Sequence, residues 1–124
     1  MKKCNFTSSQ ISDITKRLSP KFYVRINKAG NITVKHDGCD DFWVLYYVSK
    51  SNTYVWRKHK NGSCFPLHMT GRTRIGDIHK ETYAGKTFTW YNREYNANYI
   101  NFYTFTDALN YFVMYLKKYR NINI

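Results

Sequence analysis

The chain has 124 residues, a length that closes one hydrophobic core and leaves little room for a second, so we expect a single domain over 1–124. Twenty Lys and Arg against eight Asp and Glu give a formal net charge of +12, which attracts polyanions. Hydrophobic residues make up 43% of the chain and aromatic residues 19%, a composition that excludes a disordered basic tail.

Targeting signals are sparse. The segment MKKCNFTSSQ has positive charges without the apolar region of a signal peptide, and no apolar stretch approaches the ~18 residues of a membrane span. Three widely spaced cysteines, an odd number, argue against a secreted disulfide scaffold. The sequence therefore predicts a cytoplasmic protein (in the host cytoplasm if a phage encodes it) without a membrane partner, and no motif indicates a cofactor.

The first half of the chain predicts a short helix and two β-hairpins. Ser8 or Ser9 is expected to cap a helix that stops before Pro20. Period-two alternation over 22–26 and 32–34 predicts the first hairpin, with Tyr23 and Arg25 on the face opposite the apolar residues. The stretch FWVLYYVS is apolar on both parities, which predicts a central strand that pairs with the next strand over 54–59.

The second half predicts a loop, a third hairpin and a helix. Alternation weakens over 63–85, which predicts a long loop with one short strand near 72–75. Residues 86–105 are rich in Thr, Tyr, Phe and Trp, as expected for a hairpin. Thr106 or Asp107 is expected to cap a helix that ends near Tyr119. This order predicts an α+β fold: a twisted antiparallel sheet of about 5–6 strands, with an N-terminal and a C-terminal helix packed on it.

Basic residues are concentrated in the middle of the chain, where no acidic residue lies between Asp41 and Asp77. If the first four strands are neighbours, Tyr23, Arg25, Trp56 and Lys58 share the open face of the sheet and offer rings for base stacking beside cations for phosphates. The predicted nucleic-acid-binding residues are Tyr23, Arg25, Tyr54, Trp56, Arg57, Lys58, Lys60, Arg72 and Arg74. The alternative is a half-buried sheet whose Lys and Arg residues keep its edges unpaired.

Five residues of types that bind Zn²⁺ lie in the same part of the chain: His36, Cys39, His59, Cys64 and His68. They lack the paired C-x2-C spacing of structural zinc sites, and four of them meet only if two distant loops emerge at one end of the sheet. The spacing favours a polar loop histidine and small buried cysteines, so we predict no metal site.

No diagnostic catalytic motif is present. The segment GRTRIGDIHKE, residues 71–81, is not a phosphate-binding P-loop. His59, His79 and Glu81 are residue types that a small ribonuclease uses for proton transfer, with Arg72 or Arg74 for phosphate charge. Geometry decides such roles, so an enzyme remains an alternative to a binding protein.

The last helix has rings on more than one side, with Tyr111, Tyr115 and Tyr119 at i, i+4 and i+8. A surplus of aromatic surface could form a homodimer or partner interface through this helix, and the alternative that the stripe of large apolar residues favours is an aromatic core helix.

These features predict a small basic, non-catalytic binding protein for nucleic acid or a nucleoprotein complex. Small size, an A+T-rich coding bias, basic charge and the lack of a catalytic signature also resemble the small early proteins of phages. That resemblance implies a second hypothesis, an inhibitor that binds a host or defence protein through a surface complementary to an acidic groove. A small ribonuclease is the third.

Overall fold

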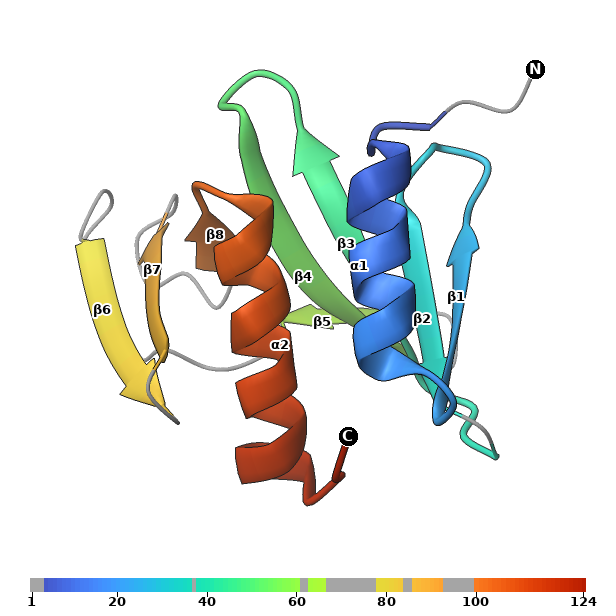
Figure 1. Cartoon of the computed structure of the whole chain (residues 1–124). Helices are drawn as coiled ribbons and strands as arrows, with labels where there is room; N and C mark the ends of the chain where they lie inside the picture. Colours follow the sequence, from blue (N-terminus) through green and yellow to red (C-terminus); the bar gives the residue numbers. More distant parts are fainter. Residues whose placement is uncertain (1–3, 37, 61–62, 67–77, 84–85, 93–99) are drawn as a thin grey trace.

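The computed structural model describes residues 4–36, 38–60, 63–66, 78–83, 86–92 and 100–124. Within them two helices flank eight strands in chain order, which confirms the α+β fold class (Figure 1). The elements are α1 (Ser8–Leu18), β1 (Phe22–Ile26), β2 (Ile32–His36), β3 (Phe42–Val48), β4 (Thr53–Lys60), β5 (Ser63–Pro66), β6 (Ile78–Tyr83), β7 (Lys86–Asn92), β8 (Ile100–Phe102) and α2 (Phe105–Arg120).

The strands form one antiparallel sheet in the order β1-β2-β3-β4-β8-β7-β6. The long strand β4 has two further partners besides β3: its first half pairs with β8 and its second half pairs with β5. The strands β5 and β6 fall in a segment where weak alternation predicts a loop, and they raise the number of strands above the five or six expected. Backbone pairing with β4 and β7 forms these strands despite the weak side-chain pattern. The short strand expected near 72–75 lies outside the described residues.

Helix α1 is capped by Thr7, one residue before the predicted caps Ser8 and Ser9. The backbone N–H of Gln10 donates to the Thr7 hydroxyl (3.1 Å), and the backbone N–H of Thr7 donates to the Gln10 side chain (2.9 Å). This capping box satisfies two N–H groups that the first turn leaves without helical partners. The predictions of Ser8 or Ser9 were wrong because either residue, once inside the first turn, lacks the extended backbone of a cap.

Helix α2 likewise begins earlier than predicted, because Thr104 and not Thr106 or Asp107 is its N-cap. The Thr104 hydroxyl accepts a hydrogen bond from the backbone N–H of Asp107 (3.1 Å). The helix therefore gains Phe105, whose side chain is buried, as an apolar residue in its first turn.

Both helices lie on the same face of the sheet (Figure 1). Helix α1 packs on β1, and α2 packs on β4, β7 and β8. The centre of the core is aromatic: the Trp56 ring stacks on Phe112 at 4.0 Å between centroids, and Trp43 meets Phe112 edge-on at 5.7 Å. The Trp56 indole N–H also donates to the Ala108 carbonyl (2.8 Å), which fixes β4 against α2.

In the described part of the chain, neither helix has the length and apolar character that a membrane span requires.

Candidate functional site

The face of β1–β4 that points away from the helices is called the open face here. Its position follows from the buried residues of the opposite parity, such as Phe22, Val34 and Trp43, which join the core. The register then places these side chains on the open face: Tyr23, Arg25, Thr33, Lys35, Phe42, Val44, Tyr46, Val55, Arg57 and His59. Exposure is greatest at its β1–β2 end, because Val44 and Val55 are buried.

Two rows of side chains cross the open face at right angles to the strands. Cross-strand pairing aligns the first, which we call the ring row: Tyr23, Lys35, Phe42 and His59. Cross-strand pairing also aligns the second row, which we call the cation row: Arg25, Thr33, Val44 and Arg57. Each row crosses four strands about 4.8 Å apart and so spans roughly 14 Å. Rings and cations thus run side by side.

The β1 end of this face is exposed and carries unneutralised positive charge. The Tyr23 side chain is 59% exposed, and Arg25 and Lys35 are exposed as well. Within the described residues, neither Arg25 nor Lys35 takes part in an ion pair or side-chain hydrogen bond. Two free cations beside an exposed ring form a surface that attracts anions.

At the β4 end, the side chains contact one another. The His59 ring stacks on Phe42 with centroids 4.9 Å apart and planes 5° apart. Nε2 of His59 lies 2.9 Å from the Tyr46 hydroxyl, and the Arg57 guanidinium lies 5.3 Å from the centre of the Tyr46 ring. Burial, and then the positive charge of Arg57, lower the pKa of His59 below its usual 6.5. The lowered pKa favours the uncharged form of the ring at neutral pH.

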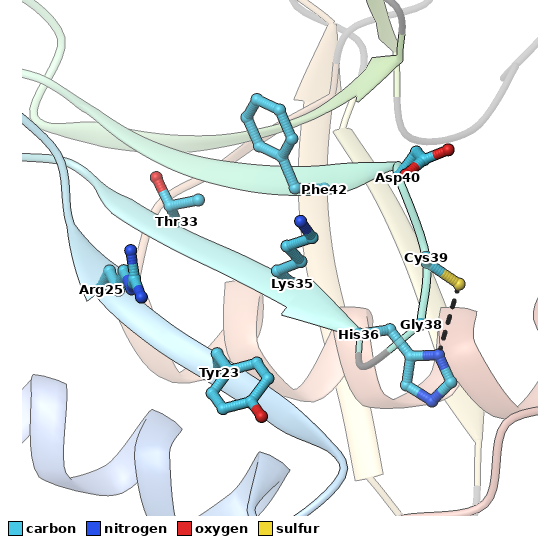
Figure 2. Close-up of a pocket in the computed structure, with 9 residues that line it drawn as sticks. All are labelled: Tyr23, Arg25, Thr33, Lys35, His36, Gly38, Cys39, Asp40 and Phe42. Atoms are coloured by element: carbon cyan, nitrogen blue, oxygen red, sulfur yellow. Dashed lines mark hydrogen bonds between the residues drawn. The ribbon is translucent and has the colours of Figure 1, made fainter.

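A pocket of about 500 Å³ lies on the open face beside the loop between β2 and β3. Figure 2 shows Tyr23 and Phe42 on either side of Lys35, with Arg25 and Asp40 at opposite ends. The loop is tied to the end of β2, because the backbone N–H of Cys39 donates to the His36 carbonyl (3.2 Å). The lining residues are Tyr23, Arg25, Thr33, Lys35, His36, Gly38, Cys39, Asp40 and Phe42.

The structure divides the predicted binding residues between the two faces. Tyr23, Arg25 and Arg57 lie on the open face, as their alternation predicts for the first two. The expectation that Trp56 and Lys58 join them was wrong. Trp56 is fully buried against α2, and Lys58 points to the helix side, where its Nζ lies 3.4 Å from an Asp41 carboxylate oxygen.

Four more of the predicted residues lie away from the open face or outside the described residues. Tyr54 has the parity of Trp56 and packs against Phe6 and Phe105, with ring centroids 6.0 Å apart in both pairs. Lys60 is exposed at the end of β4 and has the parity of the helix side. Arg72 and Arg74 lie outside the described residues.

Four ring-bearing or charged residues of the open face were not among the predicted binding residues: Lys35, Phe42, Tyr46 and His59. The signal for Lys35 was present, because it follows two alternating core residues, Ile32 and Val34. No such signal exists for Phe42 and Tyr46, since β3 is apolar on both parities.

Among the described residues, no three His, Cys, Asp or Glu side chains gather at a position that suits a metal ion. The Cys39 thiol lies 3.5 Å from Nδ1 of His36, so these two candidate ligands are neighbours. His59 belongs to the open face two strands away, and its backbone pairs with Cys64. His68 lies outside the described residues.

The histidines proposed for a ribonuclease are separated by the topology. His59 lies on β4 and His79 on β6, with β8 and β7 between them in the sheet. The sheet order therefore does not make these two histidines neighbours.

The aromatic side chains of α2 mostly belong to the core. Tyr111 and Tyr115 are 0% and 4% exposed, and Tyr119 is 42% exposed. The surface on which a homodimer was predicted is therefore smaller than the sequence indicates, and the dimer stays a prediction.

No protein-family model, curated protein or solved structure that we compared with the chain matches it.

Proposed function

We propose that the protein binds single-stranded nucleic acid on the open face of β1–β4 and performs no chemistry on it. The observation that carries this proposal is the alignment of the ring row with the cation row. Single-strand binding needs flat rings on which bases stack and, beside them, cations that follow the backbone.

The size of the surface supports this assignment. A four-stranded sheet face is a sufficient platform for two or three stacked bases, and here the Tyr23 ring is exposed and the Phe42 ring is partly exposed. Tyr23 and Phe42 are both in the ring row and stand two strands apart, about 10 Å. Flexible Lys35 lies between them, where its ammonium group can reach a phosphate.

The distribution of charge supports it as well. On the helix side, Asp41 lies 3.4 Å from Lys58 and 4.0 Å from Arg120, so positive charge there is partly neutralised. Arg25 and Lys35 on the open face have no such partner within the described residues. Arg25 and Lys35 are therefore available to the phosphates of a polyanion.

Neutralising two cations of the open face tests the proposal. For Arg25→Gln/Lys35→Gln, we expect weaker binding of a fluorescein-labelled oligothymidine and a slope of log K against log salt that is smaller by about 1.4. This change corresponds to about 0.7 per phosphate contact on a single strand. Fluorescence anisotropy at several salt concentrations measures both quantities.

Lys16→Gln/Arg17→Gln is the matched control, because it removes the same charge from α1 on the helix side. We expect this control to keep the parent slope. Equal losses in both double variants would show that net charge alone drives binding, which contradicts a site on the open face. Absence of oligonucleotide binding by the parent, together with a protein partner that is retained after nuclease treatment, would favour the inhibitor hypothesis.

A further inference from the structure

We propose that the pocket beside the β2–β3 loop binds one nucleotide of the strand and prefers guanine, with Asp40 as the residue that reads the base. This inference rests on the proposed function and adds a specificity to it. The pocket volume of about 500 Å³ lies within the range of small-ligand sites, roughly 300–1,000 Å³.

The walls of the pocket suit an aromatic base. Phe42 lines the pocket, whereas His59, which stacks on Phe42, does not. A base that stacks on the pocket side of Phe42 extends the existing stack of rings to three. Tyr23, on the other side of Lys35, offers a second exposed ring to the same ligand or to its neighbour (Figure 2).

The pocket has positively charged side chains in one part and a negatively charged side chain at the loop end. Arg25 and Lys35 line one part of it, and Asp40 stands at the loop end (Figure 2). A carboxylate on a surface that binds phosphates repels them, so the ligand must bring hydrogen-bond donors to that end. In the described part of the chain Asp40 has no ion-pair or hydrogen-bond partner, although the adjacent Asp41 lies beside Lys58. Asp40 is therefore available to a ligand.

Among the bases, guanine best meets that requirement. Its N1–H and N2–H₂ groups are adjacent donors, which two carboxylate oxygens accept in parallel. Cytosine and adenine offer one amino group on the same edge. The single N3–H of thymine or uracil is flanked by two carbonyl oxygens that repel a carboxylate. A nucleotide with its phosphate near Arg25 and guanine near Asp40 thus satisfies both ends of the pocket.

The experiment compares two fluorescein-labelled DNA octamers, eight thymidines and the same strand with one central guanosine. We expect the parent to bind the guanosine strand about tenfold more tightly, within the usual value of one bidentate base contact. For Asp40→Asn we expect less than a twofold difference between the strands, with affinity for the thymidine strand equal or higher because a negative charge is lost. Competition by 5′-GMP and 5′-TMP provides a second readout.

Asp13→Asn is the matched control, since Asp13 is an exposed carboxylate on α1 that lies outside the pocket. It is expected to keep the guanosine preference of the parent. If the parent binds both octamers equally, the guanine subsite is wrong and the open-face proposal stands. A preference that survives in Asp40→Asn also overturns the assignment of Asp40. If neither octamer binds, both proposals fail.

Discussion

At the scale of single residues, three consecutive positions of β4 have three different roles. Trp56 closes the core against α2, Arg57 lies on the open face, and Lys58 lies beside Asp41 on the helix side. Residue type does not separate Arg57 from Lys58, because both are cations in an acid-free segment. The pleat of the strand does separate them, since neighbouring side chains point to opposite faces.

The different burial of Trp56 and Tyr23 leads to a prediction about stability. Trp56→Ala removes a fully buried ring and its hydrogen bond to Ala108, so we expect the free energy of unfolding to fall by about 3–5 kcal/mol. Tyr23→Ala changes an exposed side chain and should alter it by less than about 0.5 kcal/mol. Urea denaturation followed by circular dichroism measures both. Similar losses in the two variants would contradict the assignment of faces.

The lowered pKa of His59 predicts a pH dependence. Burial, and then the charge of Arg57, make the folded chain bind this proton less tightly than the unfolded chain does. The contribution of uncharged His59 to the free energy of unfolding is therefore fully present above the unfolded-state pKa of 6.5. This contribution is lost as the pH falls through the pKa of His59 in the folded chain. Between about pH 7.5 and about pH 5.5, we expect the free energy of unfolding to fall more for the parent than for His59→Gln.

Arg57→Gln serves as a graded control for that measurement. It removes the second cause of the shift and leaves the burial of His59, so its pH dependence should lie between those of the parent and His59→Gln. If the free energy of unfolding changes equally with pH in the parent and in His59→Gln, then His59 does not contribute to this pH dependence.

At the scale of elements, the ends of the helices are decided by hydrogen bonds that the sequence pattern leaves ambiguous. Thr7, Ser8 and Ser9 are all residue types that cap helices. Gln10 selects Thr7, because only the residue three positions earlier can form a reciprocal capping box with it. Five cations in the last turns of α1 and α2 also complement the helix dipoles: Lys16, Arg17, Lys117, Lys118 and Arg120.

The cap of α1 gives a prediction that separates Thr7 from Ser9. Thr7→Ala is expected to lower the free energy of unfolding by about 1 kcal/mol, since the N–H of Gln10 loses its acceptor. Ser9→Ala, at an exposed position in the first turn, should change it by less than about 0.5 kcal/mol. Midpoints of chemical denaturation measure the difference. A larger loss for Ser9→Ala would move the cap back to the position predicted from the sequence.

At the scale of the whole molecule, the helices cover one sheet face, and on the opposite face the β1–β2 end is exposed whereas Val44 and Val55 are buried. The two helices share the same side of the sheet, and α2 packs on strands from both hairpin systems, β4 on one side and β7 and β8 on the other. The net charge of +12 attracts any polyanion, but net charge does not identify the part of the surface that a polyanion would contact. Asp41 partly neutralises Lys58 and Arg120 on the helix side, whereas Arg25 and Lys35 on the open face have no ion-pair partner among the described residues.

The sequence by itself determined the α+β class, both helices, the three predicted hairpins, and the outward direction of Tyr23 and Arg25. These features depend on local periodicity, which β1, β2 and the helices express clearly. Only the tertiary structure decided which parity of β4 faces the helices, because β3 is apolar on both parities and β4 carries rings and cations on both. Packing of Trp56 on Phe112 of α2 settled that choice, and it put Arg57 and His59 beside Phe42 on the open face.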